Sequence, residues 1–254
     1  MIQREDRGSV AVLRIEHGKV NALDTDFFDA LEDQLDFLEI SDHRSVVLTG
    51  TGRSFSAGVD LNQVLDGGVP YLREFLPALS KGLRKLFTFP RPVVAALNGH
   101  AIAGGCLLAL ACDYRVLTES GAKLGVTELQ VGVPFPVAAM EVLRFQVGDR
   151  VTHDLAYSGR LIDPQEALRL GLVDRLAAPE AVLDQALEVA ADYGRRPASA
   201  FGLTKRQLRY ELVDRIQQQE LLLEDEIAQH WSQPQTMAAI RAFLQAAAGT
   251  SPRR

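Results

Sequence analysis

The sequence predicts an α/β protein with a largely parallel, buried sheet and a helical C-terminal region. Two observations support this fold class. Short, continuous apolar runs alternate with segments whose apolar residues recur at helical spacing, which is the pattern of βαβ units. From residue 181 onward, the pattern is helical almost to the end of the chain. The 254 residues are 47% hydrophobic and 24% charged, so a sizeable core is possible.

The first predicted elements are a strand, a helix and a second strand. Residues 9–15 are rich in valine, leucine and isoleucine, which predicts a strand, and residues 24–40 carry apolar side chains at helical spacing. Residues 45–49 predict a short buried strand. The glycine- and serine-containing residues 50–58 predict a loop, and residues 71–87 predict a helix despite an internal proline and glycine.

The middle of the chain repeats this alternation. Residues 92–97 predict a continuous apolar strand, residues 104–112 a helix of small and aliphatic side chains, and residues 114–117 the next strand. A strong helix start follows at Asp163 and Pro164, because Asp is a favoured N-cap and Pro suits the first helical position.

The C-terminal region is predicted to be helical. Leu183, Leu187 and Val189 predict one apolar stripe, and residues 203–231 and 236–248 predict two further helices. No internal repeat or flexible linker is evident in the sequence. We therefore expect a core over residues 1–195 and a helical region over residues 196–254, frayed at its last five residues, that covers the sheet or packs on another subunit.

Charge and cysteine content exclude several functions. The net charge is −6 and the pI about 5.4, which argues against a nucleic-acid partner and requires a local basic cluster for any polyanionic ligand. Cys106 and Cys112 would lie on different faces of one helix, so we expect no disulfide and a reducing compartment. No His, Cys or Asp cluster has metal-ligand spacing.

No membrane partner is expected either. The N-terminus is polar, without the apolar stretch of a signal peptide. The apolar run over residues 93–112 contains Asn98 and several glycines, so a strand, turn and helix explain it better than a membrane span. We expect a cytoplasmic protein.

Three loop segments are candidates for chemistry. Residues 55–61 place small side chains after a strand, which exposes backbone N–H groups, and Asp60 can cap the next helix. Residues 98–106 place two glycines at a helix start, where N–H groups and the helix dipole favour an anionic atom. Each segment alone is equally compatible with a plain strand-to-helix turn.

The third segment, residues 125–134, holds a carboxylate in apolar surroundings. Desolvation raises the pKa of such a group, which suits a general acid or base, so Glu128 is a candidate for that role. The alternative is a capping or surface glutamate. His100 is expected to have a packing role, and Asp60 and Asp113 are expected to be caps or structural hydrogen-bond partners.

Together, these motifs resemble the enoyl-CoA hydratase/isomerase (crotonase) family. The resemblance covers roughly residues 8–175 and is weak for any single activity of the family. It rests on the following segments: Asn21-Ala22-Leu23, Phe55-Ser56-Ala57-Gly58-Val59-Asp60-Leu61, Asn98-Gly99-His100, Gly104-Gly105-Cys106, Glu128 with Gly132, Ser158-Gly159-Arg160 and Gly171-Leu172-Val173.

The resemblance implies a spiral of ββα units with a C-terminal helical region, assembled as a homotrimer or a dimer of trimers. It implies an acyl-CoA thioester as the substrate, with no separate cofactor because coenzyme A is part of that substrate. It also implies that the N–H groups of Ala57 and Gly104 bind the thioester oxygen, and that a wider set contacts the substrate: Lys19, Ala22, Ser56, Asp60, Leu61, Leu107, Pro134 and Phe135. Lys19 and Arg53, and less strongly Lys205 and Arg206, are candidates for the CoA phosphates.

One departure from the family pattern bears on the reaction. Hydratases of this family hold two glutamates, and Leu107 occupies the position of the first, so that only Glu128 remains. The family's Δ3-Δ2-enoyl-CoA isomerases likewise resemble this chain in retaining only the second. We therefore predict double-bond isomerisation from 3-enoyl-CoA to 2-enoyl-CoA in fatty-acid or related metabolism. The alternatives are a hydratase that uses Glu128 with water and a catalytically silent CoA-binding or scaffold protein.

Overall fold

The computed structural model describes residues 1–249, and residues 250–254, which include the expected frayed end, lie outside it. A six-stranded sheet lies at its centre, with the strand order β1-β2-β3-β5-β7-β9. Only β1 and β2 pair antiparallel, and the other neighbours pair in parallel. The strands are β1 (Ile2–Arg7), β2 (Val10–Ile15), β3 (Ser45–Thr49), β5 (Val93–Leu97), β7 (Tyr114–Thr118) and β9 (Arg175–Ala177).

A second, smaller parallel sheet runs beside the first. Its order is β4-β6-β8, formed by β4 (Ser54–Ser56), β6 (His100–Ile102) and β8 (Leu124–Gly125). The chain passes from a strand of the large sheet to a strand of the small sheet and then into a helix, and it does so three times. This is the expected spiral of ββα units, so the α/β fold class is confirmed.

The first two helices each begin at an aspartate N-cap. Asp24 caps α1 (Thr25–Ile40) by accepting a hydrogen bond from the Phe27 N–H, and Asp60 caps α2 (Leu61–Thr88). The predicted helix at 71–87 therefore begins ten residues earlier, with a break where Gly68 adopts a φ of 56°. Helix α2 ends the first of the three ββα units, and α3 (Gly104–Leu110) and α4 (Glu128–Val131) end the second and third.

The remaining helices follow the spiral. They are α5 (Val137–Ser158), α6 (Pro164–Leu170), α7 (Val182–Gly194), α8 (Ala198–Trp231) and α9 (Pro234–Gly249), with a short 3-10 turn at Pro179–Ala181. Asp163 caps α6 and Gly171 ends it in the left-handed conformation, as predicted. No helix in the described part of the chain is long and apolar enough to cross a membrane.

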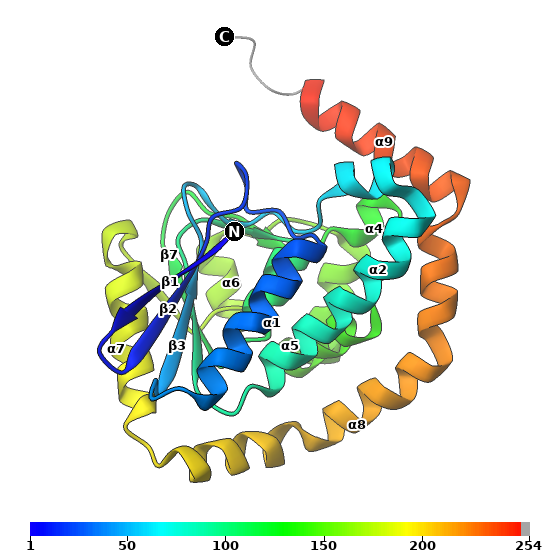
Figure 1. Cartoon of the computed structure of the whole chain (residues 1–254). Helices are drawn as coiled ribbons and strands as arrows, with labels where there is room; N and C mark the ends of the chain where they lie inside the picture. Colours follow the sequence, from blue (N-terminus) through cyan, green and yellow to red (C-terminus); the bar gives the residue numbers. More distant parts are fainter. Residues whose placement is uncertain (250–254) are drawn as a thin grey trace.

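The large sheet is covered on both faces, which explains its apolar strands. Val47 and Val94 face α7, whereas Val46 and Leu48 face the larger core beneath α1 and α2 (Figure 1). The buried face of α7 consists of Val182, Ala186, Ala190 and Gly194. The predicted stripe of Leu183, Leu187 and Val189 is only partly buried and flanks this face. The residues that contact the sheet are mostly small, because small side chains allow the helix to approach it closely.

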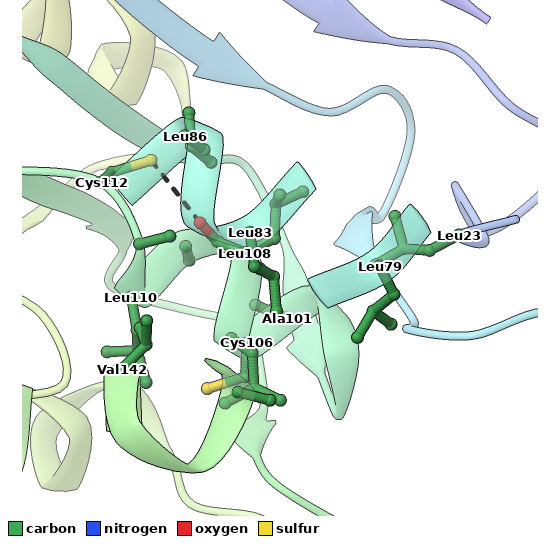
Figure 2. Close-up of a cluster of buried hydrophobic side chains, with 14 of the residues drawn as sticks. Leu23, Leu79, Leu83, Leu86, Ala101, Cys106, Leu108, Leu110, Cys112 and Val142 are labelled. Carbon is green, nitrogen blue, oxygen red and sulfur yellow. Dashed lines mark hydrogen bonds between the residues drawn. The ribbon is translucent and has the colours of Figure 1, made fainter. Parts of the chain in front are cut away.

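A buried cluster joins α2, α3 and α5 behind the loops of the spiral (Figure 2). It includes Leu83 and Leu86 of α2, Leu108 of α3 and Val142 of α5. Cys106 and Cys112 are buried, free thiols, as expected, and the Cys112 thiol contacts the Leu108 carbonyl oxygen at 3.6 Å. This cluster fixes the helices that surround the candidate site.

The C-terminal helices wrap around the rest of the chain. In Figure 1, α8 forms a long arc past α5 and α2, and α9 lies over α2 and α4. Near its start, α8 is fixed by Asp113, whose carboxylate accepts from Lys205 Nζ at 2.7 Å and Arg209 Nη2 at 2.8 Å. The helical region therefore covers α2, α4 and α5 of its own chain rather than the sheet, and the sequence had left that choice open.

Candidate active site

The side chain of Asn21 holds together the loops on one side of the site. Asn21 adopts a φ of 54°, which is uncommon outside glycine, and its buried side chain donates to the carbonyl oxygens of Thr51 and Ser54. The next residues pair with the neighbouring loop, since Leu23 N–H donates to Gly58 O at 2.8 Å and Asp60 N–H to Leu23 O at 2.9 Å. The Asn21-Ala22-Leu23 motif thus holds the 55–61 loop in place.

The start of α3 lies against the same loop. Ala103, which precedes α3, has a φ of 50° and therefore holds backbone strain. A Cβ atom on Gly105 would lie 2.2 Å from Ser56 O, so only glycine permits this contact. A Cβ atom on Gly58 would lie 3.0 Å from Gly104 N. The peptide between Gly58 and Val59 consequently lies beside the N-terminus of α3.

The backbone amides of Gly104 and Val59 at this junction have no partner among the described residues, and this pair differs from the predicted one. Gly104 N–H is free, as expected at the first position of a helix. Ala57 N–H, however, donates to Val20 O at 3.0 Å, so it is not available for a ligand. The free amide of this loop is that of Val59, because its neighbours make both bonds to Leu23. The prediction for Ala57 is corrected to Val59.

These amides border an inner cavity of about 90 Å³. Among the described residues, Glu128 is the only ionisable side chain that lines it. The rest of the lining is apolar apart from Thr127 and the indole of Trp231. We define the inner cavity by six of the residues around it, namely Val59, Leu79, Gly104, Glu128, Ala139 and Trp231.

Glu128 is buried at the first position of α4, with 7% of its surface exposed. Its Oε2 atom has no hydrogen-bond partner among the described residues. Burial raises the pKa of this carboxyl to about 7, although the backbone amides of Glu128 and Thr127 lower it in part. A group with this pKa can accept and return a proton near neutral pH. The prediction of a buried glutamate is therefore confirmed, and its alternatives, a cap or surface residue, are wrong.

Leu107 lies on the wall of the same cavity, in α3. It is 2% exposed and belongs to the apolar core. The position that holds a second glutamate in hydratases of the family is thus an apolar part of the cavity wall. Among the described residues, the cavity lining therefore holds one carboxylate rather than a pair.

An outer cavity of about 570 Å³ adjoins the inner one. Lys19, Ala22, Asp60 and Leu61, which the sequence analysis predicted as substrate contacts, all border it. Ala57, Val59, Leu61 and Phe243 border both cavities, so they form the neck between them.

The buried carboxylate of Asp24, which the sequence analysis missed as part of the site, joins two segments that border the outer cavity. Asp24 Oδ2 accepts from Gln63 at 2.7 Å and lies 2.6 Å from His17 Nε2. His17 and Gln63 both border the outer cavity.

Several predicted substrate contacts border neither cavity. Ser56 is fully buried, and its hydroxyl accepts from Gly58 N–H, so its role is structural. Pro134 and Phe135 also face away, because the Pro134 carbonyl accepts from Trp231 Nε1 at 3.0 Å and Phe135 packs in the core. Their neighbours Val133 and Pro136 line the inner cavity instead. The contact of Pro134 and Phe135 with the substrate stays a prediction, and neither residue lines the inner or the outer cavity.

The basic residues predicted to contact the CoA phosphates differ in whether they border a cavity. Lys19 borders the outer cavity, whereas Arg53, Lys205 and Arg206 do not. Lys205 donates to Asp113 near the start of α8, at the end of that helix remote from the cavities. Asp113 also accepts a hydrogen bond from the Val93 N–H, so it is structural as predicted. His100 is structural too, since its Nδ1 accepts from Lys123 N–H. The described residues contain no cluster of three or more His, Cys, Asp or Glu that could hold a metal ion.

The fold and the site together define a class of enzyme that places a buried acid/base group beside free backbone amides. Residues 5–246 match the enoyl-CoA hydratase/isomerase family. This chain belongs to that family.

Relatives with different activities share this similarity. Human mitochondrial enoyl-CoA delta isomerase 1 is 31% identical over 85% of this chain and 72% of its own. The short-chain-enoyl-CoA hydratase of Clostridium acetobutylicum is 33% identical over 73% and 72%. A Thermus thermophilus relative with a provisional hydratase name is 38% identical over 82% and 83%. The crystal structure of human mitochondrial delta3-delta2-enoyl-CoA isomerase superposes with a TM-score of 0.92, at 29% identity and 98% coverage of both chains.

Proposed function

We propose that this enzyme isomerises 3-enoyl-CoA thioesters to 2-enoyl-CoA thioesters, in fatty-acid or related acyl-CoA metabolism. The observation that supports this most is the single carboxylate of the inner cavity, Glu128, with Leu107 on the same wall. Moving a double bond by proton transfer needs one group that acts first as a base and then as an acid. Adding water needs, in addition, a group that orients and activates the water.

In the proposed reaction, the thioester oxygen accepts hydrogen bonds from the N–H groups of Val59 and Gly104. The Glu128 carboxylate takes a proton from carbon 2, and the electron pair delocalises into a dienolate whose oxygen is held by the two amides. Glu128, now protonated, returns the proton to carbon 4, which leaves a double bond between carbons 2 and 3. One preorganised amide donor typically stabilises such an oxyanion by about 3 kcal/mol. No separate cofactor takes part in this proton transfer.

The second candidate is hydration of 2-enoyl-CoA, with Glu128 activating a water molecule. It is favoured by the hydratase names of two relatives that are 33% and 38% identical to this chain. A catalytically silent CoA-binding protein is the third. An unpartnered buried carboxylate argues against the silent alternative, because it costs stability without a structural return.

One assay separates the three. Wild-type protein is incubated in parallel with 3-enoyl-CoA and 2-enoyl-CoA, and products and deuterium incorporation are followed by mass spectrometry. We expect a shift of the first substrate to exceed hydration of the second. Rapid hydration with no shift would establish the hydratase, and binding without reaction of either would favour the silent protein. Leu107→Glu is the converse variant, and we expect a small gain of hydration from it at some cost in stability.

We also propose that the chain assembles as a homotrimer or a dimer of trimers. Large apolar side chains on α8 are exposed in the single chain, with Leu221 at 88% and Leu222 at 76%. Sedimentation equilibrium tests the assembly. A monomer with full affinity for CoA would contradict it.

A further inference from the structure

The size of the inner cavity limits what can enter it. A cavity of about 150 Å³ accepts benzene, which has six carbons, so the 90 Å³ measured here has room for about four. Pockets that bind larger organic ligands usually measure about 300 Å³ or more. The inner cavity is therefore small for a pocket that receives part of a substrate.

The lining of the inner cavity includes side chains that are themselves fixed. Leu79 of α2 is 4% exposed and belongs to the apolar core. Trp231, the last residue of α8, is 2% exposed, and its indole N–H donates to the Pro134 carbonyl oxygen at 3.0 Å. Ala139, near the start of α5, is fully buried and belongs to the same lining. A long chain could extend only by displacing packed atoms.

From the cavity's volume and its fixed wall, we propose that this enzyme is specific for short acyl chains, of about four to six carbons. Leu79 and Trp231 set the upper limit. The thioester carbonyl lies at the neck, and up to about four further carbons fill the inner cavity. This inference rests on the proposed function only in placing the acyl group of a CoA thioester in the inner cavity.

The test measures binding, which does not depend on the reaction catalysed. Dissociation constants for saturated acetyl-, butanoyl-, hexanoyl-, octanoyl- and decanoyl-CoA are measured by calorimetry. We expect the affinity to rise about fourfold with each buried methylene, to reach a maximum at four to six carbons, and then to fall. An affinity that rises or stays level out to ten carbons would overturn the proposal.

Two variants test which residues form the limit. Leu79→Ala and Trp231→Phe each enlarge the inner cavity, and we expect the affinity maximum to move to about eight carbons. Leu83→Ala is the matched control, because Leu83 lies one turn further along α2, is equally buried and does not border the cavity. A maximum that stays in place in both enlarged variants, or moves equally in the control, would show that these side chains do not set the limit.

The isomerase proposal and the chain-length proposal are contradicted by different results. If no 3-enoyl-CoA of any length reacts but the affinity maximum is found, the isomerase proposal is wrong and the chain-length proposal stands. If 3-enoyl-CoAs of ten carbons react as fast as those of four, with matching affinities, the isomerase proposal stands and the chain-length proposal is wrong.

Discussion

Glu128 and Asp113 are buried to a similar degree, yet their surroundings differ in kind. Glu128 is 7% exposed, and one of its oxygens has no partner among the described residues. The Asp113 side chain is 10% exposed and accepts hydrogen bonds from Lys205, Arg209 and the Val93 amide. Burial alone therefore does not identify a catalytic carboxylate. What distinguishes Glu128 is that it is desolvated without being paired, which leaves its proton exchangeable near neutral pH.

The strongest test of this contrast is Glu128→Gln. Glutamine keeps the size of the side chain but cannot take a proton, so we expect turnover to fall by about 10²- to 10⁴-fold. Affinity for a saturated acyl-CoA, measured by calorimetry, should change much less. A variant that keeps more than a tenth of the wild-type rate would show that Glu128 is not the proton-transfer group.

A second change removes an amide rather than the carboxylate. Gly104→Pro eliminates the N–H at the first position of α3, where proline is compatible with the helix, and we expect a rate loss of about 10²- to 10³-fold. Gly104→Ala is the matched control, since it adds a Cβ atom that would lie 3.2 Å from Leu23 but keeps the amide. Equal losses in the two variants would attribute the effect to crowding and not to the donor.

The pH dependence should show the raised pKa directly. Because burial raises the pKa of Glu128 to about 7, kcat/KM should rise about tenfold per pH unit below pH 7 and level off above it.

The contribution of Glu128 to the free energy of unfolding changes with pH in the opposite direction from kcat/KM. The folded pKa lies above the unfolded value of 4.5, so the native state binds more protons than the unfolded state between these two pH values. The wild type should therefore lose stability between pH 4.5 and 7 relative to Glu128→Gln, by about 3 kcal/mol in urea denaturation. A constant difference between the two proteins across this range would contradict the raised pKa.

The smallest effect on turnover is expected from Asp113→Asn, and this variant completes the comparison. It leaves Lys205 and Arg209 buried without a counter-charge, which should destabilise the protein by about 3–5 kcal/mol. The rate per folded molecule should stay close to that of the wild type. Measurements of the folded fraction by circular dichroism and of kcat on the same sample separate the two quantities. A large loss of kcat with unchanged stability would contradict a purely structural role for Asp113.

The sequence was sufficient for most of the large elements but not for the small ones. Strands β2, β3, β5 and β7 of the large sheet were recognisable because they are buried on both faces and so are largely apolar. Strand β1 was missed because it is a polar, mostly exposed edge strand. Strands β4, β6 and β8 are two or three residues long, and β9 has three, which is too short for a periodic pattern. Helix α5 was missed because Gly148, with a φ of 72°, interrupts its periodicity.

At the site, the sequence identified the loops and the buried glutamate of the cavity but not every atom. Glu128 was recognisable because an isolated acidic residue in an apolar segment is unusual. The choice between Ala57 and Val59 depends on which amides the Leu23 and Val20 backbones engage, and composition does not reveal such pairing. Trp231 and Phe243 reach the cavity from about one hundred residues further along the chain, and no local motif indicates that contact.

The arc of α8 has a consequence for how this enzyme could diversify. The groups that we propose carry out the chemistry, Val59, Gly104 and Glu128, come from a loop and two helix starts of the spiral, whereas Trp231 and Phe243 come from the last two helices. Of the two residues that we propose limit the acyl chain, Trp231 is thus encoded apart from the reacting groups, whereas Leu79 lies within the spiral. Recombination that exchanges the tail between relatives would therefore change the part of the length limit that Trp231 forms and leave the reacting groups unchanged.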